Sequence, residues 1–146
     1  MKTFVQVTDR INTIATNHRQ INSVGRGDQW EIATSGVVNY PMFWAVPKSS
    51  VVKKGEIGYT FDLIVMDLVQ TGEGNETDIL SDTHQTLTDI LSELKMGEYE
   101  DIDIKQEGFT AQQFTEKLND MVSGWISEVT VWTPFKWDSC TIPTIT

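Results

Sequence analysis

The sequence predicts an α+β fold, in which two helices pack on a mostly antiparallel sheet of about four to five strands. Residues 56–69 alternate between apolar and polar at first and then become apolar on both faces, which is typical of a central strand beneath a helix. Residues 76–96 carry leucines at helical spacing, and residues 125–132 alternate like a second long strand. The central strand is therefore expected to organise the domain.

The composition is that of an ordinary globular domain. The chain has 146 residues, of which 39% are hydrophobic and 22% charged, and this length is enough for one real core. We predict a single α+β domain over residues 1–134 and a C-terminal tail, residues 135–146, that packs on its own domain or on a neighbouring subunit. No apolar run approaches the ~20 residues that span a bilayer, so no membrane partner is expected.

The charge balance and the cysteine content exclude several function classes. The net charge is −10, and the only dense basic group is Lys48 with Lys53 and Lys54, which is too small for a nucleic-acid footprint. A negative surface nevertheless suits a channel through which DNA slides without being gripped. Cys140 is the only cysteine, so the chain can form no internal disulfide and no cysteine-based zinc site.

An amphipathic helix is predicted over residues 2–22, because apolar positions recur there in steps of three and four residues. These positions are Phe4, Val7, Ile11, Ile14, His18 and Ile21. His18 is interpreted as a half-buried structural histidine, since no partner histidine or cysteine lies at metal-ligand spacing. A ligand or catalytic role for His18 is the alternative.

Two strands and an arm are expected before the central strand. Residues 29–33 and the aromatic segment 40–46 both favour strands. Residues 48–56 form a polar connection that is long for a tight turn, so we expect it to project as an arm. Val51 and Val52 would be unusual in a purely solvated loop, and an apolar pair on a basic arm suits contact with a neighbouring subunit.

The clearest helix is predicted over residues 76–96. Asn75 is a candidate N-cap and Gly97 a candidate C-cap. One apolar stripe runs along the helix and is wide enough to cover a face of the central strand. The stripe consists of Leu80, His84, Leu87, Leu91 and Leu94.

Residues 98–105 are rich in carboxylates. Ile102 and Ile104 alternate with Asp101 and Asp103, which predicts an edge strand with an acidic outer face. The alternative is a magnesium or manganese site of a hydrolase, built from these aspartates and a nearby glutamate.

The C-terminal third contains one confident strand. Residues 109–120 fit either a strand or a short helix, whereas residues 125–132 alternate regularly until Pro134. The tail beyond that point carries apolar residues without a regular period, which predicts that it docks on its own domain or on a partner.

The chain lacks the sequence motifs of common enzyme classes. No GxSxG, HExxH, CxxC, Walker or GxGxxG pattern occurs, and the chain has only two histidines. We therefore predict a protein that is not an enzyme and holds no metal or cofactor. Besides the hydrolase, the other alternative is a small ligand-binding module in which Trp44, Trp125 or Trp132 forms a stacking platform.

The order of the predicted segments, together with five stretches, resembles the neck and tail-completion proteins of tailed bacteriophages, of the tail-terminator type. The stretches are GRGDQWEI at 25–32, NYPMFWAVP at 39–47, FDLIVMDLV at 61–69, ETDILSDTHQTLTDIL at 76–91 and GWISEVTVWTPFKWDSCTIPT at 124–144. The resemblance covers nearly the whole chain and rests on segment order and texture. The family implies no catalytic residues.

The resemblance implies a structural virion protein, made in the host bacterial cytoplasm, that forms a ring of six or twelve copies. Such a ring would join the portal or neck of the head to the tail tube, and DNA would pass through it without specific binding. The residues expected at subunit interfaces lie on the first helix, the arm and the tail. They are Val7, Ile11, Ile14, Val51, Val52, Lys53, Lys54, Trp137 and Ile142.

Overall fold

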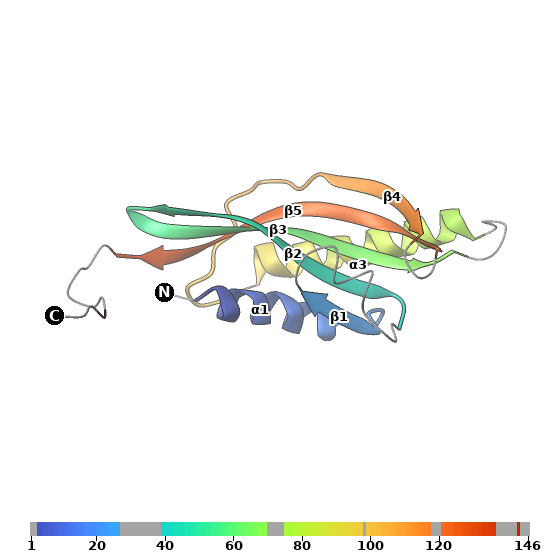
Figure 1. Ribbon diagram of the computed structural model, residues 1–146, viewed down its shortest axis with the longest axis horizontal. Helices are drawn as coiled ribbons and strands as arrows, with labels where there is room; N and C mark the ends of the chain where they lie inside the picture. Colours follow the sequence, from blue (N-terminus) through green and yellow to red (C-terminus); the bar gives the residue numbers. More distant parts are fainter. Residues whose placement is uncertain are drawn as a thin grey trace.

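The computed structural model describes residues 3–26, 39–69, 75–97, 99–117, 121–136 and 143. They form an α+β fold of two helices and a five-stranded sheet in the order β1-β2-β3-β5-β4 (Figure 1). Neighbouring strands are antiparallel except β1 and β2, so the sheet is mixed. The elements are α1 (Phe4–Thr16), β1 (Ser23–Arg26), β2 (Met42–Lys53), β3 (Gly55–Leu68), α3 (Glu76–Met96), β4 (Ala111–Lys117) and β5 (Met121–Phe135).

Strand β3 is the central strand that the sequence predicts. It pairs along its whole length with β5, from Gly55 opposite Phe135 to Leu68 opposite Val122. On its other side it pairs with β2, from Glu56 to Met66. Because both edges of β3 are hydrogen-bonded, its backbone groups need no solvent, and its apolar residues can be buried on both faces.

The core therefore has two sides. Helices α1 and α3 lie on one face of the sheet (Figure 1), and the alternate residues of β3 point toward them. The cluster on this side includes Val7, Ile11, Phe43, Phe61, Leu63, Val65, Leu87, Ile90, Val129 and Val131. A smaller buried cluster lies on the opposite face and contains Met42, Trp44, Val46, Ile64, Met66 and Val122.

Helix α1 is shorter than its apolar periodicity predicts. A capping box starts it, because the Thr3 hydroxyl accepts the Gln6 N–H while the Gln6 side chain accepts the Thr3 N–H. The helix ends at Thr16, and residues 17–20 form a turn instead of the predicted last helical turn. Ile21 is nevertheless buried in the core after this turn, so the apolar pattern continues past the end of the helix.

The strands before β3 also differ from their predicted bounds. The predicted strand at 40–46 is the first part of the longer strand β2, which continues to Lys53. The connection expected at 48–56 is thus regular β-structure with a turn at Lys54. The predicted strand at 29–33 lies outside the described residues. Polarity does not distinguish the two possibilities for residues 48–56, because an exposed β-ribbon carries polar side chains just as a loop does.

The acidic segment 98–105 is not the edge strand that its alternation predicts. It is reduced to a single bridge, in which Asp103 and Trp132 exchange both backbone hydrogen bonds at 2.8 Å. The predicted faces are nevertheless right, because Ile104 is buried and Asp103 is exposed. Asp101 has a positive φ of 61° just before the bridge, a conformation that does not belong to an extended strand. The ambiguous segment 109–120 contains strand β4.

Gly124 of β5 lies directly against the backbone of β3. A Cβ at this position would lie 1.9 Å from the Val65 carbonyl oxygen and 2.8 Å from the Met66 Cα. Both atoms belong to the backbone of the central strand, so the clash cannot be relieved by a rotamer change.

We expect Gly124→Ala to destabilise the protein by about 3 kcal/mol, because β3 or β5 must shift to admit the methyl group. Gly108→Ala is the matched control, since no atom lies within 4 Å of a Cβ there. Chemical denaturation of both variants measures the difference. Equal stabilities for the two variants would contradict the close approach.

Candidate interaction surface

The hairpin of β2 and β3 extends beyond the helical layer and forms an arm (Figure 1). We define the arm as residues 47–57. Its turn lies between the paired residues Lys53 and Glu56, and Gly55 supplies the positive φ of 95° that the turn requires. The end of β5 pairs with β3 up to Gly55, so a third strand stiffens the arm. The arm is therefore a rigid ribbon and not a loose loop.

Two valines of the arm are largely open to solvent. Val51 is 50% exposed and Val52 is 52% exposed. As neighbours on a strand they point to opposite faces of the ribbon. Both faces of the arm thus carry apolar surface next to the lysines at its tip.

A charged clamp around Trp132 holds the arm to the rest of the sheet. The indole of Trp132 lies over Gly58 on the neighbouring strand, where a Cβ would meet the ring at 2.8 Å. The ammonium groups of Lys53 and Lys105 each lie 4.6 Å from the centre of this ring. Both lysines also contact the carboxylate of Glu56, which is 3.1 Å from the Lys53 Nζ. Hydrogen bonds from Lys105 and Lys53 lower the pKa of Glu56.

The outer edge of β5 beyond β4 is closed by a side chain. The Oε1 of Gln106 accepts the Thr130 N–H at 2.8 Å, and its Nε2 donates to the Glu128 carbonyl at 3.1 Å. The side-chain amide therefore replaces one residue of a neighbouring strand. On the other side of the arm, β1 pairs with β2 only as far as Ala45, so among the described strands none pairs with the outer edge of residues 47–53.

At the base of the arm, Lys48 bridges two carboxylates that stand opposite each other on β3 and β5. Its Nζ lies 2.7 Å from Glu128 and 3.7 Å from Asp62. The hydrogen bond with Glu128 and the charge of Asp62 raise the pKa of Lys48. Burial raises the pKa of Asp62, although the Lys48 charge opposes this shift. Lys48 thus relieves the repulsion between the two paired acids.

A cleft lies between α1 and α3, beside the second half of α1 and the middle of α3. It has two adjoining hollows of about 310 Å³ and 540 Å³, which share Asn17, His18 and Asp89 in their walls. Ile14 and Ile90 line the smaller hollow, and Asp82 lines the larger one. In the smaller hollow the Arg10 guanidinium lies 4.8 Å from the centre of the Tyr99 ring.

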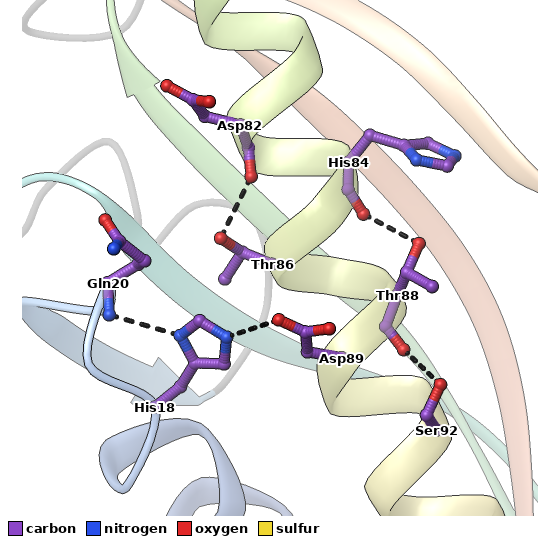
Figure 2. Close-up of polar contacts among 8 residues, drawn as sticks. All are labelled: His18, Gln20, Asp82, His84, Thr86, Thr88, Asp89 and Ser92. Carbon is purple, nitrogen blue, oxygen red and sulfur yellow. Dashed lines mark hydrogen bonds and ion pairs between the residues drawn. The ribbon is translucent and has the colours of Figure 1, made fainter.

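Both ring nitrogens of His18 are engaged at the junction of the two hollows (Figure 2). Its Nδ1 accepts the Gln20 N–H at 3.1 Å, so the proton lies on Nε2, which donates to Asp89 at 2.9 Å. No ring nitrogen is left to take a proton from a substrate. His18 links the end of α1 to the middle of α3, as expected of a structural histidine.

The predicted interface residues separate into three groups. Val51, Val52, Lys53 and Lys54 lie exposed on the arm. Trp137 and Ile142 lie outside the described residues. On α1, three apolar side chains face the sheet and α3, so the chain's own core removes them from any surface that another subunit could reach. These three are Val7 (0% exposed), Ile11 (1%) and Ile14 (7%).

The three candidate platform tryptophans have partners within the chain. Trp44 is buried with its ring over Gly25, and Trp132 lies in the clamp described above. Trp125 donates its Nε1–H to the Leu80 carbonyl at 2.8 Å and meets His84 edge to face. For the hydrolase alternative, no group of three or more His, Cys, Asp or Glu that could hold a metal ion occurs within the described part of the chain.

Sequence reasoning found the arm but missed its clamp and the cleft. Lys105, Gln106 and Trp132 come together only through the bridge at Asp103, which no local pattern reveals. The cleft depends on the turn at residues 17–20, which the helical periodicity concealed. The local signal for this turn is weak, because Asn17, Arg19 and Gln20 lie off the apolar stripe, where an amphipathic helix is polar as well.

The chain matches no model of a known protein family and no curated protein. Within the part that the structure describes, no helix is both long enough and apolar enough to cross a membrane.

We expect Glu56→Gln to lower the melting temperature at pH 7, because the neutral amide no longer holds both lysines of the clamp. The lowered pKa of Glu56 means that its stabilisation is fully present above the unfolded pKa and is lost as pH falls through the folded pKa. The difference in melting temperature between Glu56→Gln and the wild-type protein should therefore disappear as pH falls from about 5 to about 3, the range around the usual pKa of a glutamate.

Thermal unfolding monitored by circular dichroism between pH 7 and pH 3 measures this effect. Glu107→Gln is the control, since Glu107 is exposed and has no ion-pair partner among the described residues. A difference between Glu56→Gln and wild type that persists unchanged at low pH would refute the clamp.

Proposed function

We propose that the protein is a structural virion subunit, a ring-forming adaptor of the tail-terminator type that joins the head of a tailed bacteriophage to its tail. The observation that carries this proposal is the stiff arm with half-exposed valines on both faces. A monomer gains nothing from holding two valines in water on a three-stranded ribbon, whereas a subunit contact would bury them.

The rest of the molecule is consistent with a scaffold. Side chains that could take part in acid–base chemistry pair with one another: His18 pairs with Asp89, and Lys48 pairs with Asp62 and Glu128. The net charge of −10 suits a ring whose lumen lets DNA pass without binding it. The proposed partners are further copies of the chain, the portal or neck proteins and the tail tube. No described feature favours the hydrolase or the ligand-binding module.

The assembly state of the purified protein tests this proposal. We expect masses above the monomer in native mass spectrometry, alone or after addition of portal and tail-tube proteins. Joint replacement Val51→Asp and Val52→Asp should weaken assembly at least tenfold, because burial of each half-exposed valine contributes about 1 kcal/mol.

Met96→Asp is the matched control, since Met96 is 78% exposed at the end of α3 and is not part of the arm. Thermal unfolding confirms that each variant folds. A protein that stays monomeric with every one of these partners would overturn the proposal.

A further inference from the structure

We infer that the arm of one copy docks across the α1–α3 cleft of the next copy, with Lys54 of the arm facing Asp82 at the rim of the cleft. This inference rests on the proposed ring function and names the contact that would build the ring. Three observations carry it: the charge of the arm, the lining of the cleft and the directions in which the two point.

The arm has the opposite charge to the rest of the chain. It contains three lysines and one glutamate, which makes it +2 within a chain of net charge −10, so the remainder carries −12. Lys48 and Lys53 are held in ion pairs within the sheet. Lys54, at the turn, has no ion-pair partner among the described residues. The arm therefore presents one unsatisfied cation beside two exposed valines.

The cleft offers a complementary surface. Asp82 lines the larger hollow, and its carboxylate has no ion-pair partner in the described part of the chain. Figure 2 shows Asp82, Thr86 and Asp89 on the side of α3 that faces His18 and Gln20, whereas His84, Thr88 and Ser92 lie on the other side. Ile14 and Ile90 supply apolar atoms in the adjoining hollow. Arg10 and Arg19 also line the two hollows, but the acids Asp82, Asp89 and Glu93 outnumber them, so the lining has a net charge of −1 with His18 neutral. A weakly acidic cleft with apolar lining matches a lysine next to valines.

The geometry requires that the contact form between two copies. Phe4, at the start of α1, packs on Tyr59 at 5.6 Å between ring centres, so the base of the arm lies at the beginning of this helix. The cleft includes Asn17 at the opposite end of α1, roughly 20 Å away at 1.5 Å per residue. The arm projects beyond the start of α1 (Figure 1), and its three paired strands prevent it from folding back.

A contact between two different surfaces is heterologous. It propagates head to tail and closes into a ring when the rotation per subunit permits. The arm-to-cleft contact therefore gives each copy one donor surface and one acceptor surface, as a ring of any size requires.

Charge reversal on the two surfaces tests this inference by sedimentation velocity. Lys54→Glu alone and Asp82→Lys alone should each raise the dissociation constant for self-association about tenfold, because each places like charges together. In an equimolar mixture of the two variants, rings in which the variants alternate pair opposite charges at every junction, so association should recover toward the wild-type level. Assembly of the wild-type protein should also weaken as the salt concentration is raised from about 50 mM to about 500 mM.

Asp78→Lys is the matched control, because Asp78 is an exposed acid on α3 that does not line the cleft. The docking mode would be overturned if assembly resisted both charge reversals. It would also be overturned if Asp78→Lys weakened assembly as much as Asp82→Lys does. Either result would leave the ring function standing. Lack of any assembly by the wild type, alone or with portal and tail-tube proteins, would overturn both.

Discussion

The structure depends on the two-sided pairing of β3. Its neighbours β2 and β5 satisfy its backbone groups from Glu56 to Met66, and this pairing continues out of the domain into the arm. One strand therefore serves both as the centre of the core and as the middle strand of the projecting ribbon. Residues 63–66 of its inner half are buried on both faces, while its outer half carries Glu56, Gly58 and Thr60 on one face.

Glycine and tryptophan are paired twice on the face of the sheet opposite the helices. Trp44 of β2 covers Gly25 of β1, and Trp132 of β5 covers Gly58 of β3. In both pairs the indole fills the space that the missing side chain leaves, which stabilises glycine in a strand. Trp44 and Trp132 thus each pack on a glycine of the neighbouring strand.

The sequence predicted the fold class, the central strand and the second helix, because residues 56–69 and 76–96 have strong periods. The predictions were wrong where the apolar pattern continues beyond the helix or strand that it indicates. Ile21 extends the apolar stripe of α1 beyond a turn, and the isoleucines beside Asp103 alternate without a ladder. Among the candidate interface residues, the arm could be located from local sequence. The apolar stripe that contains Val7 indicates burial, but not whether the chain's own core or another subunit covers it.

The amide of Gln106 protects the edge of β5 from pairing with other chains. An unpaired strand edge can pair with the backbone of another chain, and most proteins cover such an edge with another segment or place charged side chains on it. Here a single uncharged side chain shields the stretch of β5 around Thr130. Loss of that one amide through a point mutation would leave the backbone of Glu128 and Thr130, between β4 and the bridge at Asp103, open to pairing with another chain.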